Sequence, residues 1–146
     1  RSYHKLFLGK QGFWISRLRL QLSALNGHRF NYNLIDNPFC PICTNEIEDT
    51  THFICSCPAY REARTNLTDG IQNLGICNIN DRAEIVRICL YGTDDWNINK
   101  QIYTFFCTFL DKTSRFLYIL PNPLILYIVS PTSSSWTPLI YLQESG

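Results

Sequence analysis

The sequence has no methionine, only seven glycines and seven prolines, and no long uninterrupted apolar run. The low glycine and proline content, together with an apolar share of 45%, excludes a collagen-like or a fully disordered chain. The longest apolar segment, residues 116–129, contains Pro121 and Pro123 and is shorter than the ~18 residues of a membrane-spanning helix. The 146 residues therefore predict one globular domain.

The beginning of the chain lacks the features of a complete reading frame. It opens on Arg1, with neither an initiator methionine nor a basic and then apolar signal segment. We therefore interpret the chain as a fragment of a longer protein, and we consider the function of the module separately from that of its host.

Charge is unevenly distributed, although the whole chain carries a net charge of only +1. Residues 1–39 hold six basic residues and one acidic residue, whereas residues 40–116 hold seven basic and ten acidic residues. A local excess of +5 predicts a polyanionic partner for the first segment. A solvated helix face is the simpler explanation of any such cluster.

Apolar residues recur at spacings of three and four along most of the chain before residue 117, which is typical of amphipathic helices. The widest apolar face lies in residues 97–116 and includes Phe105, Phe106 and Phe109. Five helical segments are predicted, over residues 13–25, 25–34, 58–74, 81–92 and 97–116. With no alternating strands in this part, we expect a mainly α fold: a small helical domain built around a compact knuckle, with an irregular C-terminal tail.

Four of the seven cysteines lie within 18 residues, beside a histidine. This grouping is atypical of secreted disulfide scaffolds and favours a reducing compartment and a bound metal. The spacing C-x2-C-x8-H-x4-C, formed by Cys40, Cys43, His52 and Cys57, suits a closed tetrahedral site for a structural Zn²⁺. Cys55 is an alternative to Cys57 as the fourth ligand, and a cluster of buried free thiols is the alternative to a metal site.

The chain thus divides into four predicted segments, which differ in charge and periodicity. These are a basic helical arm (1–39), a zinc knuckle (40–58), a helical C-terminal segment (59–116) and a low-charge tail (117–146). The tail has one charged residue, Glu144, and a run of three serines, so we expect it to lie outside the domain.

No set of catalytic residues accompanies the cluster, so we do not expect an enzyme. Glu46, Glu48 and Asp49 lie between the two ligand pairs, where a solvated loop explains them. Asp94 and Asp95 lack the flanking aromatic residue and apolar strand of a polymerase metal site. There is neither a glycine-rich phosphate loop nor a nucleophile elbow. The remaining cysteines are spaced apart on apolar faces and are predicted to pack in the core: Cys77, Cys89 and Cys107.

Several short motifs occur in a distinctive order along residues 13–116. They are Arg17-Leu18-Arg19-Leu20, Ser23-Ala24-Leu25-Asn26, Asn37-Pro38-Phe39-Cys40-Pro41-Ile42-Cys43, Glu48-Asp49-Thr50-Thr51-His52-Phe53, Cys57-Pro58-Ala59-Tyr60-Arg61, Leu90-Tyr91-Gly92, Asn99, Ile102 and Ser114-Arg115-Phe116. Together they resemble the C-terminal zinc-knuckle (CCHC) region of the reverse transcriptase polyproteins of non-LTR (LINE-type) retrotransposons.

The resemblance implies a module downstream of the polymerase that holds template RNA or target DNA during target-primed reverse transcription. Its partners would be RNA or DNA and the rest of a parent RNA-directed DNA polymerase, with no membrane and no small-molecule substrate. The family's life cycle implies an intracellular protein that is nuclear at the integration step. Because such reading frames often close soon after an Arg-Phe pair, matched by Arg115-Phe116, residues 117–146 would be extra sequence.

Nucleic-acid contacts are predicted for basic and aromatic residues in and around the knuckle. Phosphate contacts are predicted for Arg17, Arg19, His28, Arg29, Arg61 and Arg64. Stacking on bases is predicted for Tyr32, Phe39 or Phe53. Two alternatives stay open: a protein-interaction or scaffold domain that docks on the polymerase core through the apolar face of residues 97–116, and a nonfunctional remnant of a decayed element.

Overall fold

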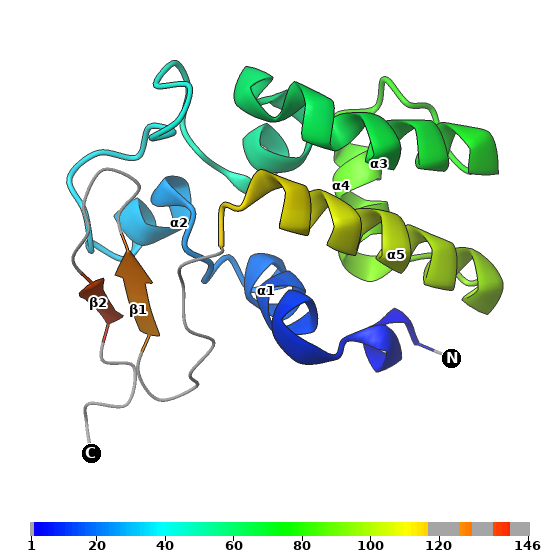
Figure 1. The fold of residues 1–146 in the computed structure, drawn as a ribbon, viewed down its shortest axis with the longest axis horizontal. Coiled ribbons are helices and arrows are strands. Elements are labelled where there is room, and N and C mark those ends of the chain that lie inside the picture. The colour runs from blue at the N-terminus through cyan, green and yellow to red at the C-terminus, as the bar shows by residue number, and fades with distance from the viewer. Residues whose placement is uncertain (1, 117–125, 130–135, 141–146) are drawn as a thin grey trace.

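The computed structural model describes residues 2–116, 126–129 and 136–140, and in residues 2–116 the chain is mostly helical, as the sequence predicts (Figure 1). The elements are the 3-10 helix η1 (Tyr3–Leu6), α1 (Gly9–Arg19), α2 (Asn26–Asn31), the π-helical turn η2 (His52–Ser56), the 3-10 helix η3 (Pro58–Tyr60), α3 (Arg61–Leu74), α4 (Arg82–Tyr91), α5 (Trp96–Thr113), β1 (Leu126–Val129) and β2 (Trp136–Ile140).

Helices α3 and α5 run alongside each other and form the largest helix–helix contact (Figure 1). Their apolar faces meet in the core, to which α3 contributes Leu67 and Ile71, and α5 contributes Phe106 and Phe109. The two helices approach closely at Gly70, where an added Cβ would lie 2.5 Å from the ring of Phe105. The wide apolar face predicted in residues 97–116 therefore packs on α3.

One hydrophobic core draws on all three predicted segments of residues 2–116. Trp14 of α1 and Phe53 of η2 are both buried in it. Phe116, just beyond α5, stacks on Trp14 with ring centroids 4.7 Å apart, and its centroid lies 5.4 Å from that of Phe53. The end of the helical region is thereby packed against both the first helix and the knuckle.

Helix boundaries differ from the predicted ones where local chemistry intervenes. The first predicted helix continues to residue 25, but α1 ends at Arg19 because Gln21 adopts a left-handed conformation with φ 57°. The last helix is predicted to begin at residue 97, but α5 begins at Trp96, because the carboxylate of Asp95 caps it by accepting the N–H groups of Asn97 at 2.8 Å and Ile98 at 3.1 Å.

Strands β1 and β2 pair antiparallel, with partners running from Leu126 and Ile140 to Val129 and Trp136. The predictions for the rest of residues 117–146 concern segments that lie outside the described residues. In the part of the chain that the structure describes, no helix is both long enough and apolar enough to cross a membrane.

Candidate metal centre

The first ligand pair lies on a tight turn between α2 and η2. The backbone N–H of Cys40 donates to the carbonyl of Glu46 at 2.7 Å, and the N–H of Thr44 donates to the carbonyl of Cys40 at 2.9 Å. Thr44 has a φ of 61°, in the left-handed region, which reverses the chain directly after Cys43. These bonds close the turn, so both sulfur atoms face the same side.

The second ligand pair lies at the two ends of the π-helical turn η2. The N–H of His52 donates to the carboxylate of Asp49 at 2.7 Å, which caps the turn. The N–H of Cys57 donates to the carbonyl of His52 at 2.7 Å, a bond that spans five residues. This wider turn matches the five-residue separation of His52 and Cys57 and brings both side chains to one place.

The ligand atoms of Cys40, Cys43, His52 and Cys57 all lie within 4.8 Å of one another. The sulfurs of Cys40 and Cys57 are 3.9 Å apart, and Nε2 of His52 is 3.4 Å from the sulfur of Cys43. In a tetrahedral zinc site with metal–sulfur distances of about 2.3 Å, neighbouring ligand atoms lie about 3.8 Å apart. The cluster therefore could hold a metal ion, and its donor set is consistent with zinc.

Cys55 does not belong to this cluster, although the spacing left it as an alternative ligand. Its sulfur approaches the backbone carbonyl of Arg82 at 3.7 Å, on the side of η2 that faces α4. Burial raises the pKa of the Cys55 thiol to about 11. The other three cysteines pack in or against the hydrophobic clusters, as predicted: Cys77, Cys89 and Cys107.

Glu46 orients the imidazole of His52. Nδ1 of the buried ring lies 3.1 Å from the Glu46 carboxylate, while Nε2 faces the sulfur of Cys43. A hydrogen bond donated by Nδ1 leaves the Nε2 lone pair for a metal, which is the usual arrangement at zinc sites. The solvated-loop interpretation overlooked this role, because nothing in the spacing singles out Glu46 from the neighbouring acids.

The thiols of the cluster have shifted pKa values because they are crowded and partly shielded from water. Burial raises the pKa of Cys40, and it raises that of Cys57 to about 12. For Cys43 burial also acts upward, but hydrogen bonds from the N–H of Asn45 and with the neighbouring thiols bring its pKa below the ordinary value. A divalent cation favours all three thiolates, so metal uptake would release protons.

Glu48 joins the knuckle to both ends of the helical region. Its completely buried carboxylate accepts two bonds from Arg115, at 2.7 and 2.8 Å, and the N–H of Asn26 at 2.6 Å. Arg115 also donates to the carbonyl of Ala24 at 3.1 Å. The prediction of a solvated loop is therefore wrong for Glu48, because a distant arginine supplies the counter-charge that permits burial.

Two residues predicted to bind phosphate make internal bonds at the knuckle. His28 is buried, with Nδ1 2.8 Å from the hydroxyl of Ser23 and Nε2 3.1 Å from that of Thr50. Burial lowers the pKa of His28, which favours the neutral ring. Arg64 donates to the carbonyls of Ile54 at 2.7 Å and Cys57 at 2.9 Å, and so satisfies the end of the π-helical turn.

The arginines of the first segment are also partly engaged within the chain. Nε of Arg17 donates to the carbonyl of Leu22 at 2.9 Å, and the guanidinium of Arg19 lies 4.4 Å from the ring centroid of Tyr91. Arg29 is half-buried, and its Nε has no hydrogen-bond partner in the described structure. Arg61, at the start of α3, is exposed.

Two of the three aromatic residues predicted to stack on bases are accessible. Tyr32 is 50% exposed and Phe39 is 45% exposed. Phe53 is completely buried and packs on Phe109, with ring centroids 5.3 Å apart. Stacking of Phe53 on a base is therefore excluded in this structure, because its apolar position on η2 places it in the core.

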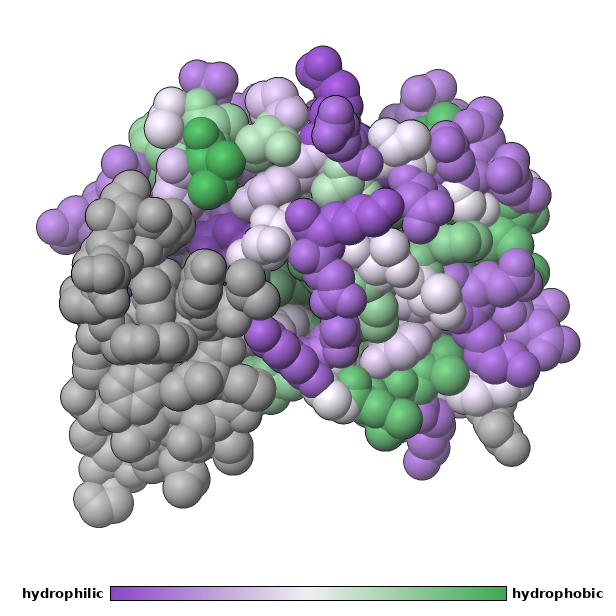
Figure 2. All heavy atoms as spheres, in the orientation of Figure 1, coloured by the Kyte–Doolittle hydropathy of each residue, from purple (hydrophilic) through white to green (hydrophobic). Residues whose placement is uncertain are grey.

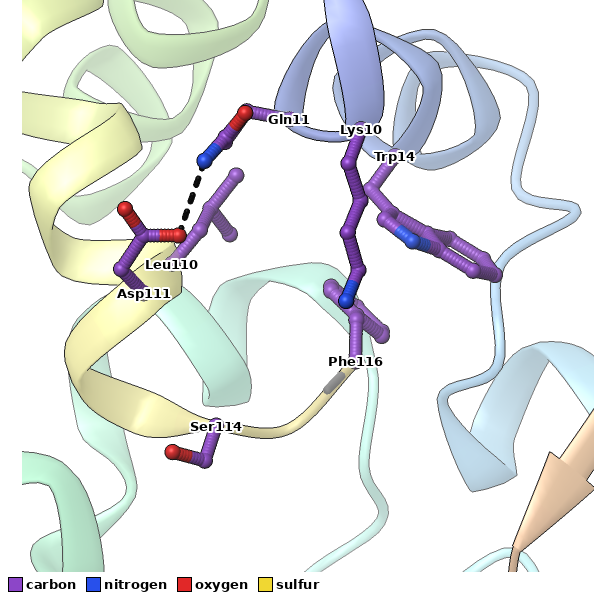
Figure 3. A pocket seen from close by; sticks show the side chains of 7 residues that line it. All are labelled: Lys10, Gln11, Trp14, Leu110, Asp111, Ser114 and Phe116. Atoms are coloured by element: carbon purple, nitrogen blue, oxygen red, sulfur yellow. Dashed lines mark hydrogen bonds between the residues drawn. The ribbon is translucent and has the colours of Figure 1, made fainter. Parts of the chain in front are cut away.

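A separate pocket of about 240 Å³ lies between α1 and the end of α5 (Figure 3). Its polar rim includes Lys10, Gln11 and Asp111, and the amide of Gln11 donates to the Asp111 carboxylate at 2.9 Å. Trp14 and Phe116 form its apolar side. The residues that line it include a single carboxylate and no histidine or cysteine, so they do not form a familiar catalytic set.

Comparisons with protein-family models, with curated proteins and with solved structures found no match to this chain. We therefore infer the function of the chain from the residues of the metal centre, from their surroundings and from the resemblance carried by the sequence motifs.

Proposed function

We propose that this chain is a non-catalytic structural-zinc module of a non-LTR retrotransposon reverse transcriptase, and that it binds template RNA or target DNA. The observation that carries the proposal is the closed cluster of three cysteines and one histidine, with Glu46 bound to the far nitrogen of His52. Four protein ligands leave no open position for a substrate, which favours a structural role for the metal.

The metal would join the two halves of the knuckle and so position the loop between them. That loop carries Glu48, whose carboxylate meets Arg115, and Thr50, whose hydroxyl meets His28. Structural zinc contributes on the order of 10 kcal/mol to the folding of small zinc modules. Bound zinc would therefore order the contacts between α2, the knuckle and the segment after α5.

Several of these contacts involve residues from the motifs that resemble the retrotransposon family. Asn26, Glu48 and Arg115 come from three separate motifs, and they meet in one buried hydrogen-bonded group. This convergence supports the resemblance, because the motifs then describe one structural unit. Nucleic-acid binding is supported by the positive charge of residues 1–39 and by exposed Tyr32 and Phe39.

Zinc content tests the first half of the proposal. Elemental analysis of the purified full chain is expected to give one zinc per molecule, retained in Cys55→Ser and lost in Cys57→Ser. The two variants make the same chemical change two residues apart, so each controls for the other. A folded chain without zinc, or equal losses in both variants, would contradict the proposed site.

The salt dependence of nucleic-acid binding tests the second half of the proposal. Binding of a fluorescent single-stranded RNA or DNA to the zinc-loaded chain is expected to weaken steeply as salt rises, since phosphate contacts release counterions. Binding that is absent at low salt would overturn the nucleic-acid role. It would leave the zinc module itself intact.

A protein-docking role is the alternative that a specific observation favours. The surface of the knuckle exposes Phe39, Ile42 and Ile47, which are 45%, 42% and 50% accessible. The apolar face of residues 97–116 is excluded as the docking surface, because Phe106 and Phe109 are buried within the chain. On the face shown in Figure 2, hydrophobic residues form small groups among hydrophilic ones. Association of a protein through Phe39, Ile42 and Ile47 would depend little on salt.

A nonfunctional remnant of a decayed element is the third possibility. An interrupted reading frame in the flanking genomic sequence would favour it.

A further inference from the structure

A second pocket, of about 270 Å³, is lined by residues of the π-helical turn η2, α3 and the start of α4. Its polar lining consists of Cys55, Arg64, Thr68, Asn80 and Arg82, and four aliphatic residues complete it. We call it the arginine pocket, because Arg64 and Arg82, from different helices, both line it. Figure 1 shows both helices in green.

Positive charge in the arginine pocket is not neutralised by an acidic side chain. Arg64 and Arg82 line the same cavity, and the pKa of Arg64 is lowered mainly by burial and also by the like charges of Arg61 and Arg82. No ion pair of the described residues involves any of them. Arg87, farther along α4, differs: its guanidinium makes two bonds to the Glu84 carboxylate, at 2.7 and 2.9 Å.

Arg64 and Arg82 have complementary roles in the arginine pocket. Arg64 is fixed, because it donates to the backbone carbonyls of Ile54 in η2 and of Cys57 directly after it. Arg82 is exposed, and no described residue accepts a hydrogen bond from its side chain. A fixed charge beside a free guanidinium favours a multiply charged or oxygen-rich anion, for which arginine provides two parallel donors.

We propose that the arginine pocket is a phosphate subsite that takes one phosphodiester group of a bound single-stranded nucleic acid, with Arg82 as the main contact. This inference rests on the proposed nucleic-acid function and identifies a surface for it. It also adds a residue, Arg82, that the sequence patterns did not single out.

The size and lining of the arginine pocket fit this ligand. Whole small-molecule ligands occupy pockets of about 300–1,000 Å³, so a cavity of about 270 Å³ suits a smaller group. The aliphatic residues Ile79 and Ile85 offer an apolar surface to a sugar, and Asn80 adds a polar residue to the lining. Because Cys55 lies between the metal ligands His52 and Cys57, the metal centre would hold this side of the pocket in place.

The test compares Arg82→Gln with Arg87→Gln in the zinc-loaded full chain. Both residues are exposed on α4, and both substitutions remove one positive charge. Binding of a fluorescein-labelled single-stranded oligonucleotide is measured by anisotropy over a range of salt concentrations. Melting temperatures of the two variants check that the fold is retained.

Arg82→Gln is expected to weaken binding about tenfold, as for the loss of a hydrogen bond to a charged group. It is also expected to reduce the slope of log affinity against log salt by about 0.7, the contribution of one phosphate contact on a single strand. Arg87→Gln is expected to change affinity by at most about twofold, because Glu84 already neutralises its charge. Equal effects of the two variants on an oligonucleotide that binds would overturn the subsite and leave the proposed function standing.

A second probe separates the subsite from the nucleic-acid function. Inorganic pyrophosphate is titrated into the ¹⁵N-labelled chain, and amide shifts are expected at Asn80 and Arg82 in the wild type but not in Arg82→Gln. If pyrophosphate binds and the oligonucleotide does not, the arginine pocket is an anion site. The assignment of its ligand as a nucleic acid is then wrong, and so is the proposed nucleic-acid function. If neither binds, the subsite and the proposed function are both overturned.

Discussion

The knuckle and the α3–α5 pair are stabilised by different kinds of interaction. In the knuckle, polar contacts accompany the buried side chains of Phe53 and Ile54: the four side chains of the candidate metal centre, the caps and turns, and the buried Glu48–Arg115 ion pair. Between α3 and α5 the contacts are apolar, from residues such as Ile71 and Phe106. A loop of this length buries too little apolar surface to fold alone, so a bound metal would add the stability that two long amphipathic helices obtain from each other.

The two regions nevertheless share a border. Phe53 of η2 contacts Phe109 of α5, and Glu48 holds Arg115 just beyond that helix. The knuckle therefore shares one hydrophobic core with the helices, although the α3–α5 part of that core contains none of the four candidate metal ligands. We expect loss of the metal centre to unfold mainly the knuckle, and substitutions in the helices to lower the stability of the whole domain without changing the metal centre of the folded state.

Loss of a metal ligand is expected to have the largest effect. Cys40→Ser should abolish metal binding, which contributes on the order of 10 kcal/mol, and should unfold residues 38–57. Hydrogen exchange measures the result: amides of the knuckle lose protection while those of α3 and α5 keep it. Cys77→Ser, outside the cluster, is the matched control. Loss of protection throughout α5 as well would show that the two regions do not unfold separately.

Truncation of the helical core is expected to have the next largest effect. Phe106→Ala removes a completely buried ring from α5 and should lower the free energy of unfolding by about 4 kcal/mol. Urea unfolding measures this loss, and Gln101→Ala, on the exposed side of α5, is the control. The zinc content of the folded variant should be unchanged. A loss of zinc from the folded state would contradict the division between the regions.

Loss of the Glu48–Arg115 ion pair is expected to have the third-largest effect. Arg115→Leu leaves the Glu48 carboxylate buried without its partner and should cost about 3 kcal/mol. The double variant Glu48→Leu with Arg115→Leu should recover part of this loss, because no uncompensated charge remains. Thermal unfolding of the wild type, both single variants and the double variant gives the coupling energy. A coupling near zero would mean that the two groups do not stabilise each other.

Loss of the Glu46 carboxylate, which orients His52, is expected to have the smallest effect. Glu46→Gln should lower zinc affinity about 10–100-fold while the fold remains, because the ring loses its charged hydrogen-bond partner. Competition with a chelating dye measures this change. Glu62→Gln, an exposed change of the same kind on α3, should leave zinc affinity unaltered. Similar affinities for both variants would remove the role assigned to Glu46.

The helices and the four ligands could be predicted from the sequence because both depend on short-range spacing. Apolar residues three and four apart specify a helix face, and the Cys-x2-Cys pair places two sulfurs on one turn. The choice between Cys55 and Cys57 could not be made in this way. It depends on the π-helical turn, whose extra residue brings Cys57 to His52 and leaves Cys55 facing α4.

The surroundings of the site could not be predicted, because they depend on segments that are far apart in the sequence. Arg64 and His28 have the residue types of phosphate contacts, but backbone carbonyls and hydroxyl groups from other elements bind their side chains. Arg82 is also an arginine, but it lines a pocket where nothing in the described structure accepts a hydrogen bond from its side chain. Sequence alone does not distinguish an arginine with an internal partner from one without.

The sequence by itself therefore determined the mainly helical class, the apolar faces of the helices and the residues able to bind a metal, since each depends on spacing within about 20 residues. Only the tertiary structure decided which charged groups are internal. Glu48 is buried because Arg115, 67 residues away, reaches it from beyond α5. Burial of a charge requires a partner in space, and the fold alone brings such partners together.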